Sequence, residues 1–285
     1  SSGVVKNLTF TNADIFNHEG NGAISAVIAY TNKGMVQNCW VTNSTIQHGD
    51  YSALGVVVGV NTGTISDCVS VSNTVKRRYS SSKAICGFVW SNSGTIQDCF
   101  NYDCSYDGSG SKYAFTQSNT GTITNCYYYE PSETLLDTIV TKKTAEQFAS
   151  GEVCYLLNGS TSTGDLTWGQ ILGTNSYPLF KTGNDTVCKA STQEIYSNHN
   201  QYGPTGFCIT CGGFVKPEIV NDEYRIENVR QLLWFAEFVN SGNQSANAKL
   251  TADINMNGID WTMMSSFAGT FDGDGHTIKG MCSNA

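Results

Sequence analysis

A short pattern of apolar and polar positions recurs along the first 130 residues. Each copy contains a glycine, a variable residue, a valine or isoleucine, a polar residue, an asparagine or aspartate, and a cysteine. Four copies occupy residues 34–39, 63–68, 94–99 and 121–126, and residues 3–8 form a fifth with leucine at the cysteine position. Their glycines lie 31, 29, 31 and 27 residues apart, and a nearly constant period of this length is typical of a solenoid.

The segments between these copies share one order of parts. An apolar strand such as 54–60 or 85–90 leads into an Asn-x-Gly turn, the repeated phrase forms a second strand, and a third follows, as in 41–46. Asparagine and glycine tolerate positive φ, which favours a turn at that position. Three short strands and three corners in about 30 residues predict an all-β fold, a right-handed parallel β-helix (β-solenoid).

Stacked coils place equivalent side chains in ladders. We expect one inward ladder of Ile65, Ile96 and Ile123. A second ladder contains cysteines that we predict to be buried free thiols, because in-register parallel strands give a strained disulfide dihedral. Its members are Leu8, Cys39, Cys68, Cys99 and Cys126. The position before them is expected to form a corner stack held by backbone hydrogen bonds, with members Asn7, Asn38, Asp67, Asp98 and Asn125.

Residues 55–65, Gly-Val-Val-Val-Gly-Val-Asn-Thr-Gly-Thr-Ile, resemble the GLUG motif. That motif occurs in large bacterial surface proteins, including adhesins and the non-catalytic parts of immunoglobulin A proteases. The resemblance covers residues 1–130, although valine replaces the usual leucine and the copies at 26–30 and 113–118 are degenerate. It implies a β-helix at the cell surface and an extracellular structural or adhesive function.

The far end of the chain resembles the segment that opens such β-helices. The resemblance lies in residues 250–255, Trp261 and residues 269–278. A helix is expected just before it, over Val229 to Asn240, with Asn228 as its N-cap and Gly242 at its end. Apolar residues of this segment fall on one helical face: Leu232, Leu233, Ala236 and Val239.

The order of these parts predicts four segments. They are coils in 1–130, a cap or packing segment in 131–187, a Cys/His knuckle or disulfide loop in 188–215, and a helix with the opening strands of a second β-helix in 216–285. About five coils are expected. Open solenoid ends expose unpaired strand edges. We therefore expect head-to-tail stacking of the chain with itself or with neighbouring repeats.

The segment 131–187 interrupts the period. Thr144 is expected to cap a short helix through Ala149, with Gln147 completing a capping box, and residues 151–157 are expected to continue that helix. Several apolar residues further on are predicted to cover the last coil. They are Trp168, Tyr177, Pro178, Leu179 and Phe180.

A cysteine and histidine cluster follows between residues 188 and 213. Cys208-Ile209-Thr210-Cys211-Gly212 is a tight knuckle that can direct two thiolates at one ion, and Cys188 and His199 complete four soft ligands suited to zinc. We predict a structural zinc at Cys188, His199, Cys208 and Cys211, because four protein ligands leave no position for substrate. A disulfide between Cys188 and one knuckle cysteine is the alternative that an extracellular location favours.

Composition and charge narrow the function classes. The formal charge of −8 and the low charged fraction of 14% disfavour nucleic acid as a partner. No apolar run approaches the roughly 20 residues of a membrane span, and residues 1–20 do not resemble a signal peptide. Strand-end tyrosines at 127–129 and outward polar residues are compatible with a glycan or host-surface partner, although packing explains aromatic residues equally well.

An enzyme is the alternative function, because parallel β-helices also carry polysaccharide lyases and hydrolases. The best catalytic candidate is Asp272-Gly273-Asp274-Gly275-His276, which the resemblance explains as a structural corner. Residues 253–258 begin like a calcium loop, but Met264 stands where an EF-hand has glutamate. We therefore expect a protein without catalytic residues.

Overall fold

The computed structural model describes residues 3–17, 24–48, 53–77, 84–131, 134–163, 165–183, 185–190, 193–198, 208, 210–211 and 217–282. Its internal contacts form two units. The first comprises Ser1–Ala149 with Leu156–Ser160, and the second comprises Ser150–Tyr155 with Thr161–Ala285. These units are coarser than the four predicted segments, which stay a prediction. Each unit is described by itself.

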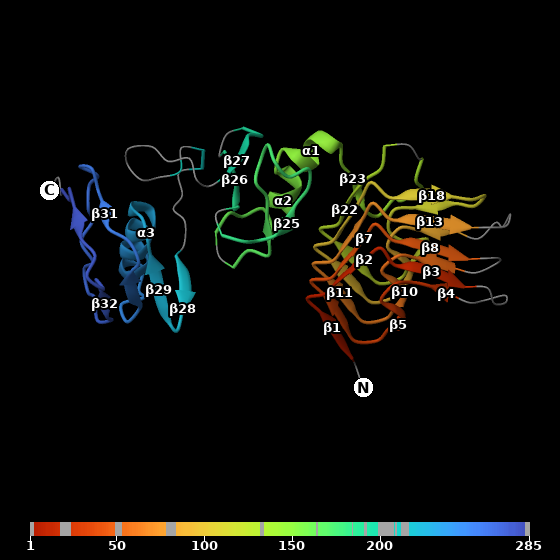
Figure 1. Ribbon diagram of the computed structural model, residues 1–285, viewed down its shortest axis with the longest axis horizontal. Coiled ribbons are helices and arrows are strands. Elements are labelled where there is room, and N and C mark those ends of the chain that lie inside the picture. The colour runs from red at the N-terminus through yellow and green to blue at the C-terminus, as the bar shows by residue number, and fades with distance from the viewer. Residues whose placement is uncertain are drawn as a thin grey trace. The chain divides into compact units, whose positions relative to one another are not determined.

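The first unit is a parallel β-helix whose strands stack rung upon rung (Figure 1), as the repeat predicts. The first coil contains β1 (Val4–Lys6), β2 (Thr9–Thr11), β3 (Asp14–Asn17), β4 (Ile24–Ser25) and β5 (Ala29–Asn32). The second contains β6 (Met35–Gln37), β7 (Trp40–Thr42), β8 (Thr45–His48), β9 (Ala53–Gly55) and β10 (Val58–Asn61). The third contains β11 (Thr64–Ser66), β12 (Val69–Val71), β13 (Thr74–Arg77), β14 (Ile85–Cys86) and β15 (Val89–Asn92).

The fourth coil contains β16 (Thr95–Gln97), β17 (Phe100–Tyr102), β18 (Ser105–Asp107), β19 (Lys112–Tyr113) and β20 (Ser118–Asn119). A fifth begins with β21 (Thr122–Thr124) and β22 (Tyr127–Tyr129), and β23 (Thr141–Lys142) pairs with β22. The described residues thus form about four complete turns and part of a fifth. Corresponding strands make five parallel sheets, in the orders β1-β6-β11-β16-β21, β2-β7-β12-β17-β22-β23, β3-β8-β13-β18, β4-β9-β14-β19 and β5-β10-β15-β20.

The prediction of three strands per coil was wrong, since the described residues of a coil contain five. The apolar stretch 54–60 shows the reason. It contains the end of β9 and the first three residues of β10, separated by a bend at Val56 and Val57, which are both fully buried. A run of apolar residues hides such a bend, because both corner side chains enter the core instead of alternating.

The predicted ladders are present. Ile65 pairs with Ile96 and Ile96 with Ile123, and this register extends back to Val36. The cysteine ladder is also confirmed, because Cys39, Cys68 and Cys99 are fully buried free thiols. The Cys68 thiol donates to the carbonyl oxygen of Ser66 at 3.1 Å, so burial leaves it hydrogen-bonded.

The Asn-x-Gly corner has a different cause from the predicted one, because none of its asparagines or glycines has positive φ. The asparagine is instead the last residue of a strand, buried at Asn32, Asn61 and Asn92 and partly buried at Asn119, and its side chain bonds to a neighbouring coil. Nδ2 of one asparagine donates to Oδ1 of the asparagine above, at 2.8, 2.7 and 2.7 Å along the series Asn32, Asn61, Asn92 and Asn119. We call this series the asparagine ladder.

The corner glycines are required by close packing between coils. A Cβ atom on Gly34, Gly63, Gly94 or Gly121 would overlap with the carbonyl oxygen of the glycine in the coil before it. Gly3, in the first coil, has open space at the same position, since nothing described lies within 4 Å of an added Cβ. The repeated glycines therefore mark the positions at which the backbones of adjacent coils approach most closely.

Positive φ occurs at the next corner, in the predicted stack of asparagine and aspartate. The φ values of Asn7, Asn38, Asp67, Asp98 and Asn125 lie between 51 and 58°. Their side chains bond along the stack where an amide is available, as from Asn125 Nδ2 to Asp98 Oδ1 at 2.6 Å. This corner confirms the expected stack, and short polar side chains suit the left-handed conformation there.

Asp67→Asn is expected to stabilise the protein at neutral pH but not in acid. Burial and the neighbouring Asp98 carboxylate raise the pKa of Asp67 to about 6, above the ordinary value of 3.8. The folded state therefore binds this proton more tightly than the unfolded state. The protonated Asp67 carboxyl therefore makes its full contribution to folding stability below about pH 4, and this contribution is lost as the pH rises through 6. After allowance for solvent screening, we expect a gain of about 1 kcal/mol at pH 7.5.

Urea unfolding at pH 4 and pH 7.5 measures this difference. Asp14→Asn, at an exposed strand position, is the control and should show no comparable gain. Equal stabilisation by Asp67→Asn at both pH values would contradict the electrostatic explanation and indicate better packing of the amide.

The last coil is closed by residues 134–143. Leu135 and Val140 pack against the core, and Asp137 bonds to two backbone groups of the fourth coil. Its Oδ2 accepts from the Ala114 N–H and its Oδ1 accepts from the Phe115 N–H at 2.9 Å. In the first coil the equivalent N–H groups donate to carbonyls of the coil above. The carboxylate thus replaces a further coil, and we call residues 134–143 the cap.

Two short helices follow the cap. Helix α1 (Ala145–Ala149) has the predicted capping box, in which the Gln147 N–H donates to Thr144 Oγ1 at 3.2 Å and the Thr144 N–H donates to Gln147 Oε1 at 2.9 Å. Helix α2 (Glu152–Leu157) does not continue it, because Gly151 between them has a φ of 90°. Phe148 of α1 packs on Phe100, with ring centroids 5.7 Å apart.

The second unit begins with small antiparallel pairs. Strand β24 (Trp168–Gly169) pairs with β25 (Leu179–Phe180), and β26 (Val187–Lys189) pairs with β27 (Tyr196–Asn198). Trp168 is fully buried against Phe180. The contacts assign these two residues to the second unit, whereas Leu135 and Val140 pack on the core of the first.

Residues 217–282 contain the predicted helix and parallel strands. Strands β28 (Glu218–Val220) and β29 (Glu223–Ile226) form a hairpin, followed by α3 (Val229–Asn240) and by β30 (Asn247–Leu250), β31 (Ile254–Asn255), β32 (Phe271–Asp272) and β33 (Ile278–Lys279). Asn228 caps α3 by accepting from the Gln231 N–H, Gly242 follows with a φ of 114°, and the predicted apolar face is buried. Strand β30 pairs in parallel with β29 and β32, and β31 with β33. No described helix has the length and apolar character of a membrane span.

Candidate metal centre

The candidate metal centre begins at Cys188, in the middle of β26. This strand pairs with β27, which places Cys188 opposite Ser197. The Cys188 thiol lies 3.4 Å from the Ser197 carbonyl oxygen and 3.5 Å from its hydroxyl. The hairpin therefore holds the first thiol in one position and surrounds it with polar atoms.

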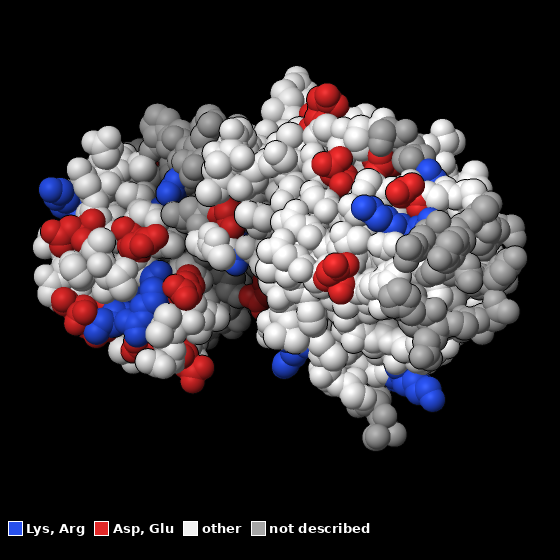
Figure 2. All heavy atoms as spheres, turned by 45° about the vertical axis from the view of Figure 1, so that its right-hand side comes forward, with Lys and Arg blue, Asp and Glu red and all other residues white. Residues whose placement is uncertain are grey.

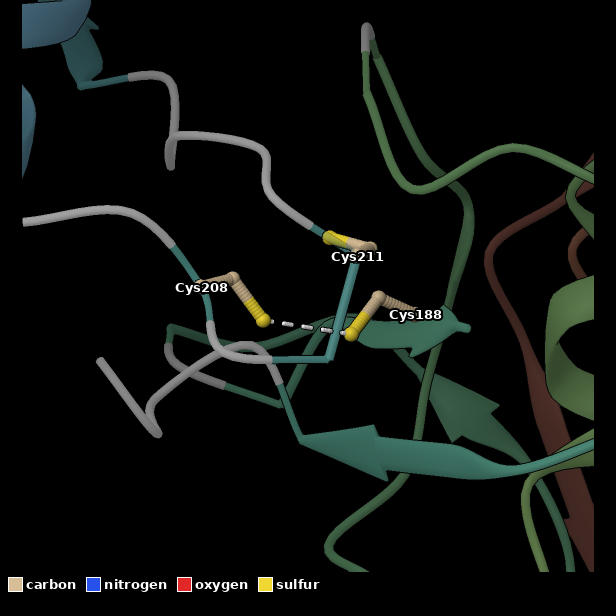
Figure 3. Close-up of side chains that lie close together, drawn as sticks. All are labelled: Cys188, Cys208 and Cys211. Atoms are coloured by element: carbon tan, nitrogen blue, oxygen red, sulfur yellow. Dashed lines mark hydrogen bonds between the residues drawn. The ribbon is translucent and has the colours of Figure 1, made fainter. Parts of the chain in front are cut away.

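The knuckle brings two more cysteines to the same place. Cys208 is fully buried and Cys211 is partly buried, and Figure 3 shows Cys208 pointing toward Cys188. Thr210 ties the knuckle to the hairpin, because the Ser197 hydroxyl donates to Thr210 Oγ1 at 2.6 Å. The sequence indicated the cysteines but not this bond, since nothing in the pattern marks Ser197 as the partner of Thr210.

The spacing of the sulfur atoms fits one tetrahedral ion. Sγ of Cys188 lies 3.6 Å from Sγ of Cys208, and the three sulfurs all lie within 4.8 Å of one another. Zinc holds sulfur at about 2.3 Å, so two ligands of a tetrahedral site are about 3.8 Å apart. A disulfide would join two sulfurs and leave the third thiol beside them, whereas one ion uses all three.

The electrostatics of the cluster also favour a cation. The Cys211 side chain and burial raise the pKa of the Cys188 thiol far above its ordinary range. Three thiolates so close together would repel one another in a site that excludes water. A divalent cation removes that cost, because coordination deprotonates the thiols and neutralises their charge.

His199, the predicted fourth ligand, lies outside the described residues. It directly follows Asn198, the last residue of β27. The three cysteines are therefore brought together as predicted, and the role of His199 stays a prediction.

The predicted catalytic candidate forms a structural corner. Asp272 and Asp274 both bind the Lys249 ammonium, at 3.3 and 2.9 Å, and His276 Nδ1 lies 3.3 Å from Asp253 Oδ1. Asp253 is the first residue of the calcium-like sequence. Its Oδ1 also accepts a hydrogen bond from the Thr277 N–H at 2.9 Å. These carboxylates hold neighbouring strands together.

The strand-end tyrosines differ from one another. Tyr128 is buried in the core of the first unit, and the Tyr127 hydroxyl donates to Asn125 Oδ1 at 2.6 Å. Packing and corner hydrogen bonds therefore account for these two aromatic side chains, as the alternative interpretation of the sequence allowed.

Searches with this chain match no protein-family model, no curated protein and no solved structure.

Proposed function

We propose that this protein is a non-catalytic structural and adhesive module of the cell surface that assembles end to end through its solenoid strands. The observation that carries the proposal is a match between two strand edges. Strand β33 of the second unit shares the Thr-Ile-polar pattern and the positive-φ corner of the strands that begin coils of the first unit, and β1 presents the edge that such a strand would fit. The GLUG resemblance supports the extracellular location.

The outer edge of the first coil exposes an unpaired strand and apolar side chains that are buried in the later coils. No described strand pairs with β1 on the side away from β6. Leu8, at the cysteine position of this coil, is 48% exposed, whereas Cys39 above it is fully buried. Burying this edge under another coil would remove apolar surface from water and satisfy the strand N–H and C=O groups.

Strand β33 has the matching features. In Thr277-Ile278-Lys279-Gly280-Met281, Ile278 corresponds to Val5 of β1, and Gly280 has a φ of 69° where Asn7 has 58°. Met281, at the position of Leu8, is also half exposed. Within the second unit Gly269 packs as the corner glycines do, since a Cβ there would overlap with the Ala246 carbonyl. The second unit thus has one corner with the same close glycine packing, before β32, whereas His276 stands at the glycine position before β33.

The proposed joint therefore has a defined register between two copies. Gly280 N–H would donate to the Lys6 carbonyl of the other copy, as Asn7 N–H donates to the Gln37 carbonyl at 3.1 Å within the solenoid. Val4 N–H would donate to the His276 carbonyl of the other copy, as Met35 N–H donates to the Gly3 carbonyl at 3.0 Å. The cap with Asp137 closes the last coil, and β33 is paired on one side only, with β31, among the described strands. Lys279 would lie beside Lys6, so added salt should strengthen the association.

Gly3→Ala is expected to block this assembly without affecting folding. An added Cβ at Gly3 meets nothing described within 4 Å, but in the joint it would overlap with the His276 carbonyl of the other copy, as a Cβ on Gly34 would overlap with Gly3. We expect an unchanged melting temperature and a loss of at least tenfold in association constant, about 1.4 kcal/mol. Sedimentation velocity across a concentration series at raised salt measures the association.

Lys33→Ala, at an exposed corner of the second coil, is the matched control and should assemble like the wild type. If the Gly3→Ala protein associates as strongly as the wild type, β1 is not the joint. On the face drawn in Figure 2, the described surface of the β-helix carries scattered charged groups of both signs separated by uncharged side chains.

We further propose that Cys188, Cys208, Cys211 and His199 bind one structural zinc ion. The protein purified with zinc is expected to contain one zinc per chain, and a chelator should lower its melting temperature, because bound metal stabilises the folded state. Cys208→Ser should lose the metal, whereas Cys282→Ser, outside the cluster, should retain it. Metal analysis and native mass spectrometry give the readout. A metal-free protein with a disulfide at Cys188 would contradict the zinc proposal.

A further inference from the structure

A shallow groove lies on the second unit between the β28–β29 turn and the loop that follows α3. The groove is open to solvent and has a volume of about 510 Å³. Its lining includes Asp222, Tyr224, Phe238, Asn243, Gln244 and Asn247. The groove combines aromatic rings with amide and carboxylate groups, and none of its lining residues belongs to β1 or β33.

Two aromatic rings, Tyr224 and Phe238, line the groove, and Trp234, outside the lining, packs against both. Trp234 stacks on Phe238 with centroids 4.7 Å apart and planes at 16°, and Tyr224 crosses Phe238 at 62° and 5.3 Å. All three side chains are only partly buried. The faces of such rings carry partial negative charge and attract the weakly positive C–H groups of a sugar ring. A pre-formed aromatic surface binds without further loss of side-chain freedom.

Polar groups line the rest of the groove, and some of them are already positioned. Asn243 Nδ2 donates to the Phe238 carbonyl at 3.1 Å, and Asn247 Oδ1 accepts from the Thr270 N–H at 2.9 Å. Within the described part of the chain, the Asp222 carboxylate and the Gln244 amide make no hydrogen bond to the protein. A carboxylate and an amide together accept from and donate to neighbouring hydroxyl groups.

We propose that this groove binds a neutral carbohydrate, a short run of hexopyranose units. The rings would contact one face of a sugar, and Asp222 and Gln244 would bond to its hydroxyls. We infer a neutral ligand because the described lining contains a carboxylate and no Lys or Arg. The protein's formal charge of −8 also disfavours an anionic ligand. Sugar acids and sulfated glycans would be repelled. The groove would give the scaffold an adhesive contact independent of its assembly.

Saturation-transfer NMR with the full chain tests this site. The probes are gluco-, manno-, xylo- and chito-oligosaccharides, with oligogalacturonate as the acidic comparison. We expect at least one neutral series to bind with a Kd of about 1 mM or tighter, and oligogalacturonate to bind more weakly. The double variant Asp222→Gly and Gln244→Ala should lower affinity at least tenfold. Glycine suits position 222, where φ is 62°, so the hairpin is retained.

Glu237→Ala, exposed on α3 and outside the lining, is the matched control and should bind like the wild type. Two results would overturn the proposal: no neutral oligosaccharide of the panel binds, or the double variant binds as tightly as the wild type. Equal binding of oligogalacturonate would show that the lining does not select against charge. Gly3→Ala should bind the sugar normally, which separates this site from the joint.

Discussion

Asn61→Ala is expected to destabilise the β-helix by about 3 kcal/mol. Asn61 is fully buried at the centre of the asparagine ladder, where its Oδ1 accepts from Asn32 and its Nδ2 donates to Asn92. Truncation removes both bonds and leaves a buried acceptor on Asn92 without its donor, and an unsatisfied buried polar atom costs about 1–3 kcal/mol. Urea unfolding followed by circular dichroism measures the loss.

Asn119→Ala is the matched control, because Asn119 ends the ladder and is only partly buried. It loses one ladder bond instead of two, so we expect a smaller destabilisation of about 1 kcal/mol. Equal losses at both positions would show that the bonds act independently of their place in the ladder, and that burial of Asn61 adds nothing.

Asp137→Ala is expected to cost about 2–3 kcal/mol and to open the last coil. The Ala114 and Phe115 N–H groups lose their acceptor in an enclosed site, and each unsatisfied donor costs about 1–3 kcal/mol. The gain from no longer burying a carboxylate reduces this sum, because burial raises the pKa of Asp137 and so disfavours its charged form. Hydrogen exchange at residues 114 and 115 reports the opening directly.

Asp107→Ala removes an exposed carboxylate from the same coil and should change stability little. If Asp137→Ala leaves the exchange rates of residues 114 and 115 unchanged, other groups of the cap satisfy these N–H groups. Faster exchange confined to the fourth coil is the result that the cap predicts, since opening at a solenoid end involves only its neighbours.

The sequence repeat predicted the stacking of the coils but not the path of each coil. The glycine spacings of 31, 29, 31 and 27 residues equal the register offsets from Val5 through Val36, Ile65 and Ile96 to Ile123. Equivalent residues must stack in a solenoid, so the period fixes the register. The bends within a coil leave no such mark, because Val56 and Val57 are consecutive apolar residues whether the chain runs straight or turns.

The asparagine corner shows the same limit at a single residue. The Asn-x-Gly sequence does form a corner, as predicted. Asn61 occupies this corner because its buried side chain hydrogen-bonds to other coils, and its backbone does not have the positive φ that the prediction assumed. A turn propensity describes one residue, whereas the ladder needs the same side chain in four coils. The repetition of asparagine at a fixed spacing was the available signal for it.

The candidate sites differ in how far the sequence reveals them. Cys208 and Cys211 are close in sequence, so the knuckle is visible, whereas the Ser197 and Thr210 bond requires the hairpin to be known. The groove is harder still. Trp234 and Phe238 share a helix face at a separation of four residues, but Tyr224 joins them from a strand that only the tertiary fold brings near.

Electron microscopy of the purified chain across a concentration series tests end-to-end assembly most directly. Pairing of β33 with β1 predicts regular fibres with one subunit per axial repeat, which appear as the concentration rises and need at least tenfold higher concentration for Gly3→Ala. Particles that stay single at the highest concentration reached, in wild type and variant alike, would contradict assembly through the solenoid strands.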